Sequence, residues 1–211
     1  MGNTMLAADL HRILSDVRPF ASKDKVLPSI CQVRIESNES SIIAAATDRF
    51  TLGISHADYS GEKLAVNLVT SNIDNLIRLA KTPRAVEGRT VEIVETAGTV
   101  HGATWKFIFS TGEELSVMAE TTDFPKFRQL LPSESIDEKA QGNVAVTYDA
   151  ARLAKFAKVS GSEDMNVISR GRDCEVAKPT VVTIGNHFIG LIMPSRRDSR
   201  PSYTKPQWID L

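Results

Sequence analysis

The sequence predicts an α+β protein built from a repeated unit, in which a short amphipathic helix is followed by antiparallel strands. Three observations predict this fold class. Apolar residues recur at helical spacing in three places, strand-like apolar runs follow each of them, and turn residues separate the runs. With 211 residues, of which 42% are hydrophobic and 24% charged, the chain can bury a core without disulfide bonds.

The first unit is expected to open with a helix over residues 6–17, because apolar residues from Leu6 to Val17 recur three and four positions apart. Pro19 marks the end of this helix, since proline cannot continue the helical hydrogen-bond pattern. Strand-like runs follow it. The expected strands of this unit are residues 30–35, 41–47 and 51–55.

The second unit is expected to place a strand, residues 64–70, before its helix. Ser71 or Asn72 can cap a helix over residues 73–81, and Pro83 ends it. Glycines fall between the runs that follow, as hairpin turns require. The expected strands after this helix are residues 90–95, 103–110 and 114–119.

The third unit follows the order of the second. A strand over residues 144–147 precedes a helix over residues 148–158, which turns Leu153 and Phe156 inward. The expected strands after this helix are residues 165–169, 181–184 and 188–192. The acidic, polar residues 133–142 predict a linker before this unit, and residues 197–211 predict a flexible tail after it.

The placement of charge is the first functional signal. A net charge of −1, from 25 basic and 26 acidic residues, excludes a simple polycation that coats nucleic acid. Each expected helix carries an acid near its start and bases further along. Macrodipole complementarity explains this pattern in any single helix, but its repetition in all three favours a shared basic surface that faces a polyanion such as DNA. The candidate DNA-contacting residues are Arg12, Arg18, Arg78, Lys81, Arg84, Arg152, Lys155 and Lys158.

Signatures of catalysis are missing from the sequence. It contains no HExxH, CxxC, GxxxxGK[ST] or GxSxG pattern, and its four histidines fall in four different elements. We therefore expect neither an enzyme nor a metal or cofactor site. Cys31 and Cys174 are far apart and indicate two buried thiols in a reducing compartment. No apolar run is long enough to span a bilayer and no secretory signal opens the chain, so we expect a cytoplasmic protein without a membrane partner.

Three stretches resemble the bacterial sliding clamp, the beta subunit of DNA polymerase III. Residues 46–52 (ATDRFTL) are similar to the clamp's ATD-x-x-x-L strand end. Residues 124–132 (FPKFRQLLP) are similar to the segment that leads from one clamp domain to the next, and residues 188–196 (FIGLIMPSR) to the last strand, which ends in MP-x-R. Each motif is short, but all three occur in the family's order within a helix-then-strands repeat.

The resemblance implies the DNA-clamp fold and a topological function. In this family the helices line the hole of a homo-oligomeric ring and face DNA phosphates without reading bases, while the sheets continue across domain boundaries. The ring slides on duplex DNA and tethers a polymerase, and no bond is made or broken. The expected partners are therefore double-stranded DNA, a DNA polymerase and a clamp loader.

The family also has a hydrophobic pocket that captures short linear motifs of the polymerase and the loader. The residues of this chain that match it are Thr47, Leu52, Pro132, Leu191, Met193, Pro194 and Arg196. The alternative for Leu52, Leu191 and Met193 is ordinary strand core. Arg49 departs from the small residue often found at its position, and Ser195 replaces a residue that is often apolar, so the preferred partner is expected to differ.

Length is the main departure from the family, whose subunit has three domains of two units each. Residues 1–132 are expected to form one complete clamp-like domain, residues 133–142 a linker, residues 143–196 a half-domain and residues 197–211 a tail. A half-domain leaves an apolar sheet face uncovered, which another chain's half-domain could cover. Four chains would then supply six domains, and such a compact clamp would suit a virus or mobile element.

Two alternatives stay open at this point. A clamp-like protein that forms no ring could act as an adaptor that binds a host clamp, polymerase or clamp loader. The chain also ends in QWIDL, residues 207–211, which loosely fits the motif that clamps capture. This segment is either a tether that docks in a clamp pocket or an ordinary tail with one exposed tryptophan.

Overall fold

The computed structural model describes residues 3–81, 86–99, 102–132, 146–161, 164–169 and 178–195. The predicted linker, the predicted tail with its last five residues, and Cys174 lie outside these ranges. The helices and strands, in chain order, are β1 (Thr4–Leu6), α1 (Ala7–Val17), η1 (Arg18–Phe20), η2 (Pro28–Ile30), β2 (Gln32–Ser37), β3 (Ser41–Thr47), β4 (Thr51–Asp58), β5 (Ala65–Val69), α2 (Thr70–Ala80), β6 (Thr90–Thr99), β7 (Gly102–Phe109), β8 (Glu114–Met118), η3 (Phe127–Leu130), α3 (Ala150–Leu153), η5 (Phe156–Lys158), β9 (Met165–Ile168), β10 (Thr180–Ile184) and β11 (Phe188–Ile192).

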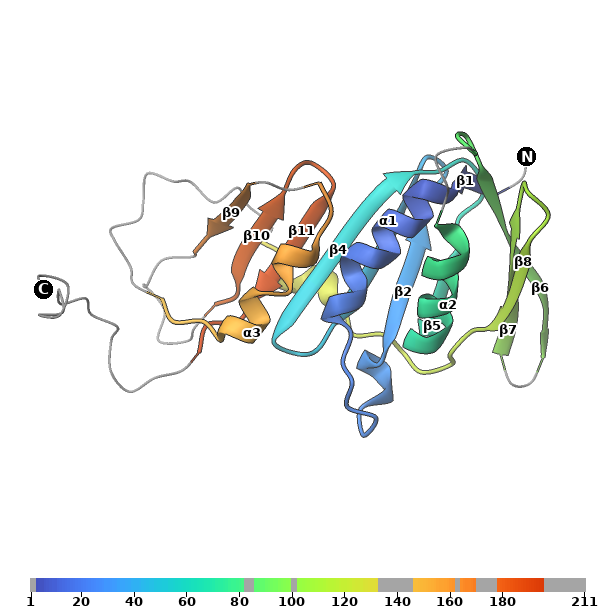
Figure 1. The fold of residues 1–211 in the computed structure, drawn as a ribbon. Helices are drawn as coiled ribbons and strands as arrows, with labels where there is room; N and C mark the ends of the chain where they lie inside the picture. Colours follow the sequence, from blue (N-terminus) through green and yellow to red (C-terminus); the bar gives the residue numbers. More distant parts are fainter. Residues whose placement is uncertain are drawn as a thin grey trace, which may run out of the picture.

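The described strands form two antiparallel sheets (Figure 1). A seven-stranded sheet has the order β5-β2-β3-β4-β11-β10-β9, and a four-stranded sheet has the order β1-β6-β7-β8. The predicted α+β class is therefore confirmed. Within these ranges no helix is both long and apolar enough to cross a membrane.

One core joins the two sheets through helices α1 and α2, which pack against each other. The buried face of α1 presents Leu10 and Leu14, and that of α2 presents Ile73 and Leu76. Phe107 of the four-stranded sheet lies in the same core and is fully buried. Both helices and both sheets share this one cluster, so the first two units depend on each other for their stability.

The third unit joins the sheet of the first, because β11 pairs with β4 in antiparallel register. Gly190 lies opposite Gly53 in this pairing, and the two glycines make room for aromatic rings. The ring of Phe20 lies over Gly53, and that of Phe156 over Gly190. Their ring centroids are 5.0 Å apart, and Phe188 completes the cluster at 5.6 Å from Phe20. Edge-to-face and tilted contacts at these distances are favourable, so the cluster fastens the third unit to the first.

Adding a side chain at Gly190 is expected to loosen this junction. A Cβ atom there would stand 2.5 Å from the Phe156 ring and 2.8 Å from the carbonyl oxygen of Leu52, which is backbone and cannot turn away. We expect Gly190→Ala to lower the free energy of unfolding by about 1–3 kcal/mol, measured by urea denaturation. Gly98→Ala is the control, since no atom lies within 4 Å of the Cβ it would add. Equal stability of the two variants would contradict the packing described here.

Several predicted elements are confirmed closely. The strands over 41–47 and 188–192 have the predicted bounds, and the first helix, Ala7–Val17, begins one residue later than expected. The second helix begins earlier, at Thr70, directly after β5. Ser71 and Asn72 therefore lie inside the helix, and the prediction that one of them caps it is wrong. The N-cap is Val69, which makes no side-chain capping bond.

The third helix differs most from the prediction. The helix expected over 148–158 is divided into α3, of four residues, and the short 3-10 helix η5. Asp149 caps α3 by accepting hydrogen bonds from the N–H groups of Ala151 and Arg152. Residues 154–155 then turn, which directs Phe156 into the aromatic cluster. The strand expected over 144–147 is not formed at residues 146–147, the part of it that is described.

Candidate nucleic-acid and peptide interface

Helices α1, α2 and α3 lie on the same side of the seven-stranded sheet (Figure 1). This is the arrangement that a shared basic surface requires, because bases on the three helices can then face one ligand. Arg78 and Lys81 are exposed on α2 and at its end, and Lys158 is exposed at the end of η5. These three cations have no ion pair among the described residues, although Arg78 donates a hydrogen bond to Asn75. Arg84 lies outside the described residues.

The other predicted DNA contacts on the first unit are held within the fold. Arg12 donates a hydrogen bond to the carbonyl oxygen of His56 at 3.0 Å and pairs with Asp9 at 3.3 Å. Arg18 donates two hydrogen bonds to the carboxylate of Asp74, at 2.7 and 2.9 Å. The Arg18–Asp74 pair links the end of α1 to α2 in the bidentate geometry that suits guanidinium and carboxylate. Both arginines therefore have structural partners in addition to any ligand.

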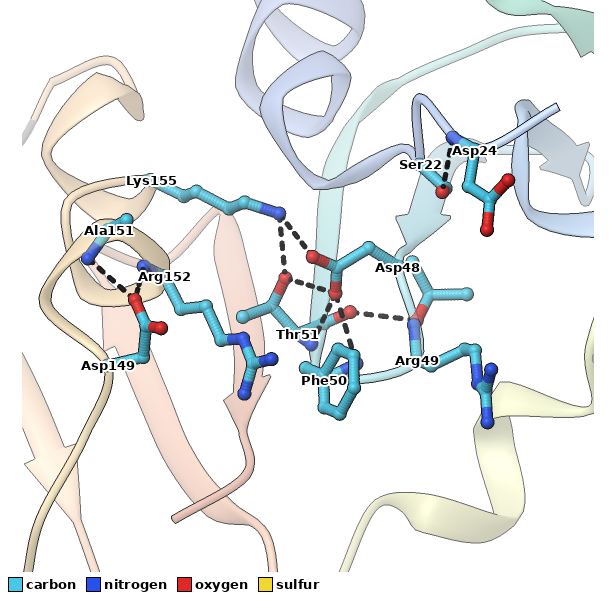
Figure 2. A network of polar contacts seen from close by, with 11 residues as sticks. Ser22, Asp24, Asp48, Arg49, Phe50, Thr51, Asp149, Ala151, Arg152 and Lys155 are labelled. Atoms are coloured by element: carbon cyan, nitrogen blue, oxygen red, sulfur yellow. Dashed lines mark hydrogen bonds and ion pairs between the residues drawn. The ribbon is translucent and has the colours of Figure 1, made fainter. Parts of the chain in front are cut away.

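Two cations of the third unit, Arg152 and Lys155, contact the loop between β3 and β4 (Figure 2). The Lys155 ammonium donates to Asp48 at 2.5 Å and to the hydroxyl of Thr51 at 3.3 Å. The guanidinium of Arg152 stacks on Phe50, with its central carbon 3.6 Å from the ring centroid. The third unit is thus fixed to the first by an ion pair and a cation–π contact as well as by strand pairing.

The β3–β4 loop is itself rigidly built. Asp48 accepts hydrogen bonds from the backbone N–H groups of Phe50 and Thr51 and from the Thr51 hydroxyl. Thr47 donates its hydroxyl to the carbonyl oxygen of Thr51 and accepts from the N–H of Arg49. Arg49 adopts a φ of 79°, which is uncommon for a residue with a side chain. The loop therefore presents Arg49 and Phe50 outward in one conformation.

The stability that this loop provides depends on pH through the Asp48 carboxyl. Burial raises its pKa, but hydrogen bonds from Lys155 and Thr51 outweigh burial, so the pKa lies below the ordinary value of 3.8. Because the folded-state pKa is lowered, the ion pair stabilises the fold at any pH above the ordinary pKa of the carboxyl. This stabilisation is lost as the pH falls through the folded-state pKa. We expect the stability difference between the wild type and Asp48→Asn to shrink on acidification below about pH 4. Urea midpoints measured across this range test it, and a constant difference would contradict it.

A second polar network fixes the third unit to the first. It lies toward the end of β4 that is farther from the β3–β4 loop. Asp16 of α1 is fully buried, and its carboxylate accepts hydrogen bonds from the hydroxyl of Ser55 at 2.9 Å and the N–H of Ser160 at 2.8 Å. Arg12 and His187 each bring a nitrogen within 3.8 Å of it. One carboxylate thus joins α1, β4 and the third unit. Asp16 carries no distinct signal in the sequence, because an acid on the inner face of a helix cannot be recognised without its distant partners.

The residues predicted for the peptide pocket come together only in part. Leu52 and Leu191 lie opposite each other in the β4–β11 pairing, and Thr47 lies opposite Leu52 in β3. The two leucines are only 2% and 4% exposed, and they belong to one buried apolar cluster with Phe127. Phe127 comes from the segment expected to connect the domains, so this segment of the chain contributes to the cluster. The apolar binding role of these residues stays a prediction.

The remaining pocket residues lie at the margin of this cluster. Met193 and Pro194 follow β11 and are half-buried, and the N–H of Met193 donates to the carbonyl oxygen of Phe50 at 2.8 Å. Pro132 is half-buried after Leu131, which packs on the cluster. Arg196 lies outside the described residues. Among the described residues, no group of three or more His, Cys, Asp and Glu could hold a metal ion. Cys31 is half-buried rather than buried, and its thiol donates to the carbonyl oxygen of Asp24.

The fold of this chain is similar to that of solved structures, although the sequences are distant. No protein-family model matches the chain. The solved structure of the DNA polymerase III subunit beta from Pseudomonas aeruginosa is 15% identical, with a TM-score of 0.75, and the match covers 93% of this chain and 67% of that one. The beta subunit from Thermotoga maritima is 11% identical, with a TM-score of 0.73 and coverage of 93% and 66%. The sliding clamp from Bacillus subtilis is 13% identical, with a TM-score of 0.71 and coverage of 93% and 64%.

These matches show that the chain has the fold of DNA polymerase sliding clamps, in a shorter version. The chain spans about two thirds of the length of the clamps it matches. The predicted clamp fold is therefore confirmed.

Proposed function

We propose that this chain is the subunit of a DNA sliding clamp, a ring that encircles duplex DNA without sequence specificity and docks replication proteins. The observation that carries the proposal is the sliding-clamp fold with α1, α2 and α3 on one side of the sheet and exposed cations on that side. Such a ring acts by topology, so it makes and breaks no bond and needs no cofactor. The role belongs in the cytoplasm, with a DNA polymerase and a clamp loader as partners.

The charge arrangement suits sliding better than tight binding. Lys81 and Lys158 are free to approach phosphates, whereas Arg18 and Lys155 are held by Asp74 and Asp48. Few phosphate contacts give weak, salt-sensitive affinity, since each contact that is made adds to the salt dependence. A ring that is retained by its topology does not need more phosphate contacts, and weak contacts allow it to move along the duplex.

We propose that more than one copy of the chain closes the ring. The outermost described strand of the larger sheet, β9, exposes Met165 and Val167, which are 38% and 43% accessible. They lie across from Ile184 and Val182 of β10, which are buried. An apolar strand at the end of a sheet favours pairing with a second copy. Homo-oligomerisation, with four chains as the assembly that supplies six domains, is part of the proposal.

Retention on DNA of different topology tests the proposed function. The protein, loaded on nicked circular DNA, is expected to stay bound during gel filtration at a salt concentration that removes it from linear DNA. Linearising the circle should release it. Absolute mass by light scattering, expected at a multiple of the 23.1 kDa chain, accompanies the measurement. Equal loss from circles and linear DNA would overturn the ring.

The adaptor alternative has one observation in its favour. Arg12, Arg18 and Lys155, three of the eight predicted DNA contacts, are engaged by carboxylates of the same chain. A protein that bound a partner and no DNA would have this property. It would stay a monomer at every concentration, and it would show no retention on circular DNA.

A further inference from the structure

An open hollow of about 530 Å³ lies beside the β3–β4 loop. Three segments that are distant in sequence line it: residues 18–30 after α1, the loop at residues 48–50, and residues 151–158 of the third unit. The hollow therefore exists only when the third unit is fixed to the first. None of the residues predicted for the peptide pocket lines it.

We propose that this hollow binds a protein segment that carries aspartate or glutamate beside an apolar side chain. The inference rests on the proposed function, since it names the chemistry of the partners that a clamp would dock. It also moves the docking position away from Leu52 and Leu191, which are already buried in a cluster with Phe127. Recognition then depends first on charge and second on apolar contact.

The charge of the hollow supports an acidic ligand. Lys23, Arg49, Arg152 and Lys158 line it, and none of the four has an ion pair among the described residues. Of the two carboxylates that line it, Asp48 is neutralised by Lys155, so Asp24 is the one that opposes these four cations. The hollow therefore concentrates positive charge on a chain whose net charge is −1, and a ligand with carboxylates is attracted to it.

Two arginines are held in positions that suit carboxylates. Arg152 lies flat on Phe50 (Figure 2), which covers one face of the guanidinium and leaves its N–H edges available. A stacked, planar guanidinium is preorganised for two parallel hydrogen bonds to a carboxylate. Arg49 projects from the loop whose backbone Thr47 and Asp48 fix, so the point from which its side chain extends is set before a ligand arrives.

The apolar lining explains why the ligand needs more than charge. Leu27 and Ile30 line the hollow from the first unit, and Phe50, which is 44% exposed, lines it from the loop. Burial of one leucine or phenylalanine side chain of a partner against them would add to affinity. Arginine and aromatic side chains are enriched in protein–protein interfaces, so Arg49, Arg152 and Phe50 suit a docking role.

A protein segment fits this lining better than a single strand of nucleic acid. Sequence-independent single-strand sites stack successive bases on several aromatic side chains. Phe50 is the one aromatic side chain among the described residues that line the hollow, and Arg152 already covers one of its faces.

The test uses the full-length protein and a short fluorescent peptide in which aspartates and glutamates flank one leucine. Anisotropy should show binding that weakens with salt, and no binding of the same peptide with lysine in place of each acid. We expect Arg49→Asn to weaken binding about tenfold. Asparagine tolerates the positive φ at this position, so the substitution removes the charge without straining the loop.

Lysines 23 and 25 give a matched pair of further variants. Both are exposed and lie in the same loop, but only Lys23 lines the hollow. Lys23→Asn should weaken peptide binding several-fold, and Lys25→Asn should leave it within about twofold. Equal effects of the two substitutions, or an unchanged affinity in Arg49→Asn, would overturn the proposal. Oligo(dT) that binds where the peptide does not, with an affinity that Arg49→Asn reduces, would assign the hollow to nucleic acid and overturn it too.

Retention on nicked circular DNA separates this inference from the proposed function. Arg49→Asn should be retained on circles like the wild type while it loses the peptide. If the wild type binds the peptide but is not retained on circles, the clamp function fails and the hollow stands. If it is retained but does not bind the peptide, the hollow fails and the clamp function stands.

Discussion

Asp16→Ala is expected to lower the free energy of unfolding by about 3 kcal/mol. The substitution leaves the hydroxyl of Ser55 and the N–H of Ser160 without their acceptor, and it removes the negative charge beside Arg12. Because Asp16 is fully buried, water cannot replace these bonds without opening the junction. Urea denaturation measures the loss, and hydrogen exchange at β10 and β11 should show that the third unit loosens first.

Asp9→Ala is the matched control for this prediction. Asp9 lies on the same helix and also pairs with Arg12, but its side chain is 30% exposed. Exposed ion pairs contribute little, so we expect a change of about 0.5 kcal/mol or less. A similar loss in both variants would mean that the charge of α1, rather than the buried network, determines stability.

The triple variant Arg78→Glu, Lys81→Glu and Lys158→Glu is expected to lose retention on nicked circular DNA. These cations are exposed on the helical side, so their reversal replaces attraction to phosphate with repulsion. They are also free of ion pairs with the described residues, so the fold should be unaffected, and an unchanged urea midpoint checks it. Arg18 and Lys155 are left in place because they hold Asp74 and Asp48.

A second triple variant, Lys25→Glu, Lys63→Glu and Lys178→Glu, controls for net charge. These lysines are exposed outside α1, α2 and α3, and the total change of charge is the same. Its retention should fall only slightly. Loss in both variants would indicate a general charge effect, and retention in both would mean that the helices do not face DNA.

The local signals in the sequence were enough to predict the elements but not how they join. Residues 41–47 and 188–192 are apolar runs between turn residues, and their strands have the predicted bounds. That β11 pairs with β4 depends on contacts between residues far apart in the chain, such as Gly190 with Gly53. A sequence pattern carries no measure of such contacts. The prediction of one continuous third helix was wrong for the same reason, because Phe156 packs in the aromatic cluster and the helix is interrupted before it.

The candidate site shows a similar division. The spacing of cations on the helices was visible in the sequence, but the partners of Arg18 and Lys155 lie 56 and 107 residues away. The hollow was missed because three separate segments form it. Arg49 did give a signal, since a cation stands at a position where the resembling family often has a small residue.

The pairing of β4 on both sides, by β3 and by β11, has a consequence for symmetry. Since both edges of β4 are occupied within its own chain, contact with another copy falls to a strand at the end of a sheet, and β9 is one such strand. A contact between β9 and its counterpart relates the two chains by a two-fold axis. If this contact alternates around a ring with a second like-to-like contact, the number of chains is even and the ring has two equivalent faces. Such a ring has no direction, so it would offer docking positions both ahead of and behind a polymerase that moves along the duplex.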